Sequence, residues 1–335
     1  MRVLERLERL YGIGGGLGAN RPFASPEEDE AHEVAKGWLR DAGLAIEVDP
    51  DGNLIGSKCE RADVWTGSHL DTVPRGGRFD GALGVAAAIE AVERVGRGSV
   101  VVFRGEEVGC IGSRARAARG PLPSAFVELH IEQGQRLAAA GAPLGVVTAI
   151  AGIARGDLVV EGQAGHAGTT PMKGRDDALC KAAELVLRVR DTAASIEGAV
   201  ATVGRVEVEP GAANVIPSRV TLALDARAPD LSRFERLIAA LGLEPTYRVE
   251  PVEMAPALRA VLLEELAAKG LPQVELASGA GHDAGILAAA GVPSAMLFVR
   301  SLAGGVSHSP DELSAPEDVA LAVEVLTAAV ARLTD

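Results

Sequence analysis

The sequence predicts an α/β protein with a mixed sheet, into which a smaller α+β domain is inserted. Apolar runs alternate with helical patterns up to residue 147 and again from residue 257, which is typical of layered α/β folds. Between these stretches the order of elements changes. The chain has 335 residues, 47% of them hydrophobic, which is long for one ordinary domain. We therefore expect one discontinuous domain, 1–147 with 257–335, and a second at 148–256.

In the first part of the chain we expect two helices, a short strand pair and three buried strands. Residues Pro26–Ala42 place acidic residues in the first turns and apolar ones at helical spacing, and Gly43 follows as a stop. A short strand pair is expected around Asp51–Asn53. Three apolar runs then end in VWTGSHLDT, SVVVFRGEE and AFVELHIEQG, and the pattern GVAAAIEAVERV between the first two predicts a helix.

The inserted segment has the order of a ferredoxin-like unit. The run LVVEGQAGHAG is followed by a helix at Asp176–Arg190, the strands GAVATVGRVEV and RVTLALDAR, and a helix at Leu231–Leu241. This indicates the β-α-β-β-α-β arrangement. After Pro256 the pattern returns to a helix, the buried strand GVPSAMLFV and the closing helix PEDVALAVEVLTAAVARL.

Composition favours a small-molecule substrate in a reducing compartment. The net charge of -13 disfavours nucleic acid and anionic membranes as partners, because both attract basic surfaces. The cysteines Cys59, Cys110 and Cys180 form no CxxC pair, so neither a disulfide framework nor a thiolate zinc site is indicated. The N-terminus lacks the apolar core of a signal peptide, and no run of about 18 apolar residues occurs. We expect a cytoplasmic protein.

Several polar residues follow the ends of the predicted strands, where open α/β sheets bind ligands. His69 ends one apolar run, and Asp71 lies two residues on, where it can accept the second imidazole N–H and leave the other nitrogen for a metal. Asp80 stands at the start of the next helix. That position suits either a carboxylate that bridges two cations or an ordinary helix N-cap.

Two adjacent glutamates and two further histidines extend this pattern. Glu106 and Glu107 repel each other unless a cation lies nearby; one could bind the metal while the other activates water. The alternative is a solvated strand end. His130 lies on the next strand, and His308 lies in a Gly/Ser loop after GVPSAMLFV. Imidazole and carboxylate ligands without sulfur suit Zn²⁺ and also accept Mn²⁺, Co²⁺ or Ni²⁺, and paired ions share an activated water.

The motifs GSHLDTVPRGGRFDGALGV, RGEE, ELHIEQG, GQAGHAGTTPMKGRDDAL, NVIPSRVTLALDAR, SGAGHDA and GGVSHSPDE resemble those of the hydantoinase/carbamoylase family. This family is a branch of the aminoacylase and carboxypeptidase clan of dinuclear metallohydrolases. The resemblance implies a metallopeptidase-like catalytic domain at 1–147 and 257–335, with a lid and dimerisation domain at 148–256. It also implies the metal ligands and the general base: His69, Asp80 and His130 for one ion, Asp80, Glu107 and His308 for the other, and Glu106 as base to a metal-bridged hydroxide.

The resemblance also gives the inserted domain a role in binding substrate. His166 resembles the histidine that a partner subunit places on the substrate carbonyl oxygen, which implies a homodimer. Asn214 and Arg227 resemble residues that bind the substrate carboxylate, a group that an arginine fork matches well. From the residues alone, Arg227 could equally form a surface salt bridge and Asn214 could be a turn residue.

Four more residues complete the expected site. Gln133 resembles a polar contact to the ureido group, and the backbone at Gly304 is expected to approach the substrate closely, since glycine permits this. His282 and Asp283 are expected to brace the site from behind, with direct contact between His282 and substrate left open.

The leading functional hypothesis is hydrolysis of an N-carbamoyl-L-amino acid or an allantoate-like carboxylate. Carbamoylases have a longer segment than the 23 positions that lead from Glu107 to His130. An N-acyl-amino-acid or dipeptide substrate therefore remains an alternative, as does a catalytically silent metabolite-binding relative. Two other features are not expected to act: the glycine-rich Gly12–Ala19 lacks the strand-turn-helix context of a dinucleotide loop, and Cys110 has no basic partner in view.

Overall fold

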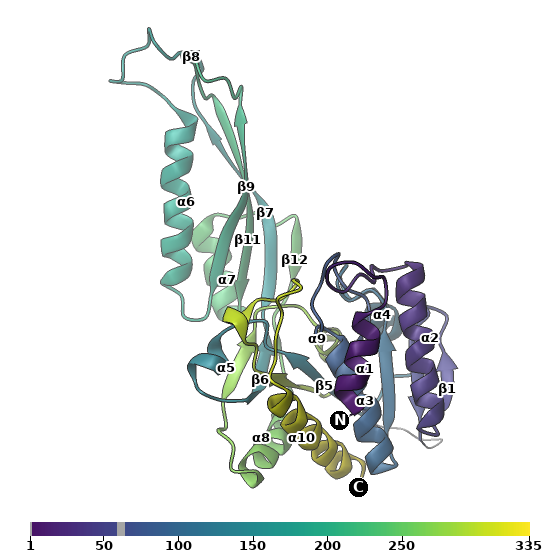
Figure 1. Cartoon of the computed structure of the whole chain (residues 1–335). Coiled ribbons are helices and arrows are strands. Elements are labelled where there is room, and N and C mark those ends of the chain that lie inside the picture. The colour runs from purple at the N-terminus through teal and green to yellow at the C-terminus, as the bar shows by residue number, and fades with distance from the viewer. Residues whose placement is uncertain (1, 59–63) are drawn as a thin grey trace. The chain divides into compact units, whose positions relative to one another are not determined.

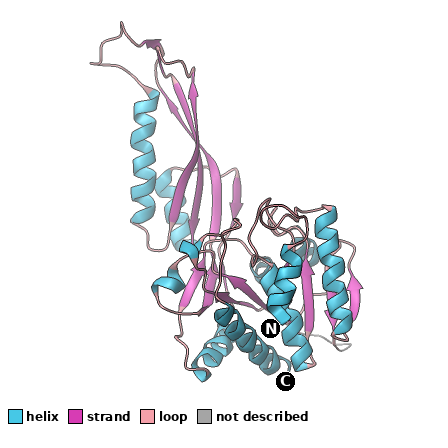
Figure 2. Ribbon diagram, viewed as in Figure 1, coloured by secondary structure: helices cyan, strands magenta, loops and turns pink. Residues whose placement is uncertain are grey.

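The computed structural model of the chain describes residues 2–58 and 64–335; Cys59 lies outside these residues (Figure 1). The chain divides into two compact units. One consists of Met1–Thr148 with Glu253–Asp335, and the other of Ala149–Val252. Figure 2 shows that both units combine helices with sheets.

A mixed sheet runs through the first unit. Among the described residues it has nine strands in the order β1-β2-β4-β3-β5-β15-β6-β13, with β14 pairing β6 beside this path. The strands are β1 (Ala45–Val48), β2 (Leu54–Ser57), β3 (Val64–His69), β4 (Ser99–Phe103), β5 (Ala125–Ile131), β6 (Leu144–Ile150), β13 (Val252–Glu253), β14 (Glu275–Ser278) and β15 (Ser294–Val299).

Four neighbouring strands at the centre of this sheet run parallel. β3 pairs with β4 on one side and with β5 on the other, and β15 pairs with β5, all in parallel register. β1, β2 and β6 join antiparallel to their neighbours, so the predicted mixed sheet is confirmed. The four parallel strands are buried along their whole length, and their carboxyl ends meet at one edge of the sheet.

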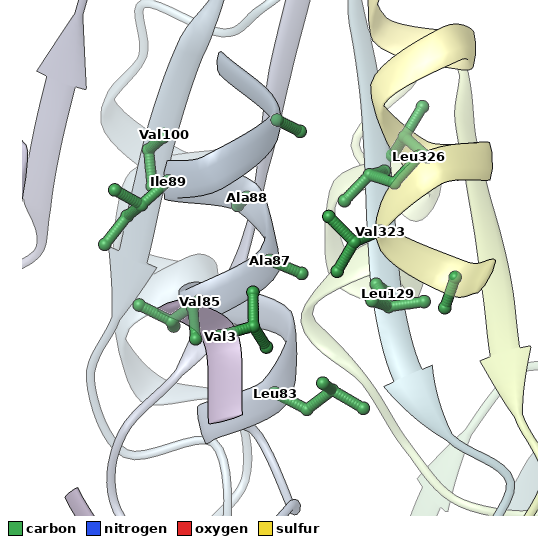
Figure 3. Packing of buried hydrophobic residues seen from close by; sticks show 14 of the residues in the cluster. Val3, Leu83, Val85, Ala87, Ala88, Ile89, Val100, Leu129, Val323 and Leu326 are labelled. Atoms are coloured by element: carbon green, nitrogen blue, oxygen red, sulfur yellow. The ribbon is translucent and has the colours of Figure 1, made fainter. Parts of the chain in front are cut away.

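Helices cover the sheet and build the main core. Figure 3 shows Ala87, Ala88 and Ile89 of α3 among side chains from α1, β5 and α10, and all are fully buried. The small side chains of α3 allow close packing around this helix. The helices are α1 (Arg2–Tyr11), α2 (Pro26–Asp41), α3 (Ala82–Val95), α4 (Ile111–Arg119), α5 (Arg136–Ala139), α8 (Pro256–Ala268), α9 (Asp283–Ala289) and α10 (Pro316–Thr334), with the 3-10 turn η1 (Ala303–Gly305).

The second unit has the β-α-β-β-α-β order. Its four-stranded antiparallel sheet is ordered β12-β7-β11-β9, and a separate strand pair joins β8 to β10. The alternate residues of β11 that are buried pack with α6 and α7 in a second core. The elements are β7 (Gly152–Glu161), β8 (Gly165–His166), α6 (Ala178–Ala194), β9 (Val200–Glu209), β10 (Val215–Ile216), β11 (Arg219–Ala228), α7 (Leu231–Leu241) and β12 (Tyr247–Val249).

The structure places the glycine-rich segment and Cys110, which were not expected to act. The segment Gly12–Ala19 follows α1 and not a strand, so the context of a dinucleotide loop is absent from this described segment. Cys110 is buried, and burial, together with the neighbouring carboxylates of Glu106 and Asp283, raises the pKa of its thiol well above the usual value. Of the helices in 2–58 and 64–335, none is long and apolar enough to cross a membrane.

Candidate metal centre and active site

The parallel strands bring the predicted metal ligands to one edge of the sheet. His69 is the last residue of β3, and His130 is the last but one of β5. Glu107 follows β4, and His308 follows β15 in the loop after η1. Asp80 comes from the segment between β3 and α3. Residues spread over 240 positions of sequence therefore share one small volume, because parallel strands end at the same edge.

The first ligand group consists of His69, Asp80 and His130. Oδ1 of Asp80 lies 3.2 Å from Nε2 of His130 and 3.6 Å from Nε2 of His69. All three side chains are buried. One atom from each lies within 4.8 Å of the others, close enough to surround a single ion.

The second ligand group shares Asp80. Its other oxygen, Oδ2, lies 3.3 Å from Nε2 of His308, which in turn lies 3.3 Å from Oε2 of Glu107. The two oxygens of Asp80 thus face two different groups, as a bridging carboxylate would. The alternative role of Asp80 as an N-cap does not hold, because Gly81 is the N-cap of α3 and no described side chain caps that helix.

The imidazoles are oriented for cation binding. Nδ1 of His69 donates to the carbonyl oxygen of Asp71 at 3.1 Å, and Nδ1 of His130 donates to that of Ile131 at 3.0 Å. When such a ring is neutral, its lone pair lies on Nε2. Both Nε2 atoms are buried and have no hydrogen-bond partner among the described residues. An unprotonated Nε2 and the carboxylate of Asp80 are both acceptors, so burying them face to face is unfavourable unless a cation lies between them. Imidazole nitrogens and a carboxylate are suitable ligands for a metal ion, and these residues therefore fit one.

A glycine makes room for the His69 ring. Gly81 has φ of 61°, and a Cβ at this position would overlap the imidazole of His69. Because a larger residue would be both strained and in collision, glycine is required directly after Asp80.

The carboxylates of the site stabilise the protonated form of the neighbouring imidazoles. The hydrogen bond to Asp80, opposed by burial, raises the pKa of His308 to about 9. Burial lowers the pKa of His69, but the charges of Glu106, Asp71 and Asp80 outweigh it and raise that pKa well above its usual value. Without a metal, therefore, these imidazoles take up protons. Metal ions and protons compete for the same lone pairs.

Glu106 is close to the ligands but in neither ligand group. Its Oε2 lies 3.7 Å from Nε2 of His69, and its Oε1 lies 3.7 Å from Nδ1 of His282. Burial raises the pKa of Glu106 well above the usual value, and the nearby carboxylates of Asp283 and Asp80 add to this effect. A carboxylate with a raised pKa beside a metal site is equipped to accept and return a proton.

Asp71 fixes the turn that carries both glutamates. Its Oδ1 accepts the backbone N–H of Glu106 and its Oδ2 that of Glu107, each at 3.1 Å. The same carboxylate lies 3.3 Å from Nδ1 of His69. The expected contact with His69 is therefore present. The sequence does not predict the two hydrogen bonds from the backbone of Glu106 and Glu107 to Asp71.

Behind the ligands lies a buried polar layer. Nε2 of His282 lies 2.9 Å from the hydroxyl of Ser278, and Asp283 is fully buried. Glu128, which the sequence reasoning missed, accepts the Ser68 hydroxyl at 2.7 Å and the backbone N–H of Ala284 at 3.0 Å. Glu128 thereby connects the strand end at His69 to the start of α9. The signal that could have found it is an acidic residue inside the apolar run AFVELHI.

Gln133 contacts the bridging carboxylate. Its Nε2 donates to Oδ2 of Asp80 at 2.9 Å and to the hydroxyl of Ser307 at 3.1 Å. Its backbone has φ of 55°, a left-handed conformation that is uncommon outside glycine. At the remaining predicted contact, Gly304, the backbone oxygen accepts from the Gln135 side chain. Gln133 is thus held against the carboxylate of Asp80.

The second unit separates the predicted substrate-binding residues into two places. The exposed residues His166 and Asn214 lie close together, because β8 pairs with β10 and the Ala167 N–H donates to the carbonyl oxygen of Asn214. Arg227 lies at the opposite end of β11 from Arg219, eight residues or roughly 27 Å along the strand.

Arg227 and Asn214 have the local contacts of the two alternatives that the sequence left open, a salt bridge and a turn. Arg227 forms a two-point salt bridge with Asp225, from Nε to Oδ1 at 2.7 Å and from Nη2 to Oδ2 at 3.1 Å. Asn214 lies in a turn before β10. Neither arrangement prevents a contact with substrate.

Known proteins resemble this chain over most of its length. The model of Peptidase family M20/M25/M40 matches residues 65–332. The chain is 35% identical to the N-carbamoyl-L-amino acid amidohydrolase of Geobacillus stearothermophilus, covering 97% of this chain and 96% of that protein. It is 33% identical to the allantoate amidohydrolase of Bacillus subtilis, covering 95% and 93%. A hydantoinase/carbamoylase amidase structure from Burkholderia multivorans superposes with a TM-score of 0.89 at 29% identity, covering 99% and 97%.

The alignment with the Geobacillus protein runs over 397 positions, more than the 335 residues of this chain, so the relative has segments that are lacking here. The matches nevertheless extend over nearly the whole length of the chain. The chain therefore belongs to Peptidase family M20/M25/M40 and, within it, to the hydantoinase/carbamoylase amidases.

Proposed function

We propose that this protein hydrolyses the carbamoyl (ureido) group of a carboxylate-bearing small molecule, releasing ammonia and CO₂. The observation that carries the proposal is the position of Asp80, whose two oxygens face the buried imidazoles of His69 and His130 on one side and His308 with Glu107 on the other. The named relatives act on N-carbamoyl-L-amino acids and on allantoate, which supports this substrate class.

The site is proposed to hold two divalent ions per chain. His69, Asp80 and His130 would hold one ion, and Asp80, Glu107 and His308 the other. Imidazole and carboxylate ligands fit Zn²⁺ first, and Mn²⁺, Co²⁺ or Ni²⁺ are also compatible. When bound, such a pair lowers the pKa of a shared water and polarises the substrate carbonyl. The family is metal-dependent, which supports the assignment in general terms.

Glu106 is proposed to move the proton. It would take a proton from the attacking water and deliver it to the leaving nitrogen. A pKa raised above the usual carboxylate range suits both steps, because the group must accept the proton and then release it. Asp71 supports this role by holding the backbone on which Glu106 sits.

The second unit is proposed to bind substrate as part of a homodimer. His166 and Asn214 belong to the strand pair next to the Arg219 end of β11, whereas Arg227 lies eight residues, or roughly 27 Å, along that strand, farther than a small substrate can span. If both sets touch one substrate, they must come from two subunits. His166 would then stabilise the developing oxyanion across the dimer, while Arg227, aligned by Asp225, would bind the substrate carboxylate.

The alternative enzyme keeps the metals but cleaves an N-acyl amino acid or a dipeptide. The short segment between Glu107 and His130 is the feature that favours it. A panel of N-carbamoyl-L-amino acids, allantoate, N-acyl amino acids and dipeptides, assayed with Zn²⁺ or Mn²⁺, separates the two. Ammonia release from the carbamoyl compounds or allantoate is the expected result. Turnover of only the acyl or peptide compounds would overturn the carbamoyl assignment.

A catalytically silent, metabolite-binding protein is the third possibility. It is disfavoured because the structure gathers all five proposed ligands and Glu106 at one sheet edge. A wild-type protein that binds metal but turns over no member of the panel would favour it.

A further inference from the structure

Glu312 contacts two separate segments of the metal centre. It lies in the loop between η1 and α10, and its side chain is 5% exposed. Oε1 accepts the backbone N–H of Phe79 at 2.7 Å and that of Asp80 at 3.1 Å. Oε2 accepts the hydroxyl of Ser307 at 2.7 Å. One carboxylate therefore holds the backbone of the shared ligand and the residue next to His308.

The His308 segment needs such a tether. The His308 side chain is 50% exposed, whereas those of the first ligand group are almost fully buried, so packing alone does not fix it. The backbone of His308 has φ of 53°, a conformation that is disfavoured for residues other than glycine. A strained, half-exposed ligand keeps its position only where neighbouring contacts hold it. Ser307, bonded to Glu312, supplies such a contact.

The chain leaves space for this carboxylate. A Cβ on Gly77 would overlap the carboxyl group of Glu312, and the backbone φ of Gly77 is not positive. Glycine at position 77 therefore makes room for the Glu312 side chain. The backbone conformation of Gly77 would itself allow other residues.

We propose that Glu312 is a positioning residue for the second metal site, which sets the separation between Asp80 and His308. This inference rests on the proposed assignment of Asp80, Glu107 and His308 as ligands. Residues that orient metal ligands from behind typically contribute 10–100-fold to metal affinity. Glu312 touches neither the substrate nor the proposed ions.

The main test compares Glu312→Ala with Glu312→Gln. Zn²⁺ is titrated into the metal-free protein in competition with a chromophoric chelator. Glu312→Ala is expected to weaken one of two Zn²⁺ sites by about 10–100-fold and to leave the other within a few fold. Glu312→Gln is expected to restore affinity, because its amide oxygen can still accept both N–H groups and its amide nitrogen can donate to Ser307. A role through charge alone would make the two variants equally weak.

A second variant tests the same contact from the opposite side. Gly77→Ala should displace the Glu312 carboxylate and weaken the same Zn²⁺ site. The double variant Gly77→Ala with Glu312→Ala should then be no weaker than either single variant, because both changes remove one interaction. The single variant Gly77→Ala also keeps the proposal testable if Glu312→Ala fails to fold.

Asp49→Ala is the matched control. Asp49 is also 5% exposed and accepts two backbone N–H groups, from Asp51 and Asn53, but it contacts no proposed ligand. It should lower the melting temperature without changing either Zn²⁺ affinity. Two unchanged Zn²⁺ affinities in both Glu312→Ala and Gly77→Ala would overturn the inference. Failure of the wild type to hydrolyse the substrate panel would overturn the proposed function instead, while leaving the Zn²⁺ result to stand.

Discussion

Oδ1 of Asp71 accepts the backbone N–H of Glu106 at 3.1 Å. The second oxygen accepts the next N–H, that of Glu107, and the carboxylate also lies 3.3 Å from Nδ1 of His69. Burial raises the pKa of Asp71, but His69 and the two N–H groups outweigh it and lower that pKa. An ionised, buried carboxylate thus orients a proposed metal ligand, His69, and the proposed general base, Glu106, together.

Asp71→Asn is expected to damage both elements. An amide presents only one acceptor oxygen, so its NH₂ group would face one of the two backbone N–H donors. Loss of a buried bond to a charged group costs about 1.5–3 kcal/mol. We expect a lower melting temperature and a fall in kcat. Asp49→Asn is the control, since Asp49 accepts two N–H groups away from the site. It should reduce stability only; equal losses of kcat in both variants would contradict this role.

Glu106→Gln is expected to abolish proton transfer while the metals stay bound. Glu106 belongs to neither ligand group, and a glutamine of the same shape cannot accept the proton. General-base catalysis contributes about 10²–10⁴-fold, so kcat should fall by that factor. Metal content measured by mass spectrometry should equal that of the wild type. Loss of a metal equivalent from the variant would show that Glu106 is a ligand.

The stability of the metal-free protein should fall as pH rises from about 6.5 to about 9. The pKa of His308 is raised from 6.5 to about 9 by Asp80, and burial with the charge of Glu128 raises that of Asp283 from 3.8 to about 8. In this range the folded chain holds protons that the unfolded chain has released, so each step up in pH favours unfolding.

Bound metal supplies the positive charge that these protons supply in its absence. The melting temperature of Zn²⁺-loaded protein should therefore depend less on pH. The difference between the melting temperatures of the Zn²⁺-loaded and the metal-free protein should increase towards pH 9. Melting curves of both forms at matched pH test this. A melting temperature of the metal-free protein that rises across the range would contradict the sign.

Hybrid dimers should recover activity from two inactive variants. In a hybrid of Glu106→Gln and His166→Ala chains, one site combines an intact Glu106 with the intact His166 of the other subunit. Random mixing after reversible dissociation makes half of the dimers hybrid, so about a quarter of wild-type activity should return. If His166 acts within its own chain, no activity would return.

The sequence predicts which residues meet at this sheet edge because their signals are local. His69, Glu107 and His130 each end or follow an apolar run, and parallel strands place such ends side by side. The helix expected near Leu231–Leu241 is present as α7, and α2 ends one residue earlier than predicted. Helix α6 extends to Ala194, four residues beyond the prediction, because no glycine or proline stops it at Arg190.

The supporting contacts could not be predicted in the same way. Glu312 reaches Phe79 across 233 positions, and Gln133 reaches Asp80 across 53, and neither pair has a periodic pattern that links them. Their rotamers depend on the packed tertiary structure. The need for a glycine at position 77 is apparent only in the structure, where a Cβ on Gly77 would overlap the carboxyl group of Glu312.

Anomalous X-ray diffraction from Zn²⁺-loaded crystals tests most directly whether Asp80 bridges two metal ions. We expect two peaks per chain, about 3.5–4 Å apart, with one oxygen of Asp80 directed at each. In crystals of His308→Ala, only the peak beside His69 and His130 should remain. A single peak in the wild type, or two peaks that Asp80 does not join, would contradict the account.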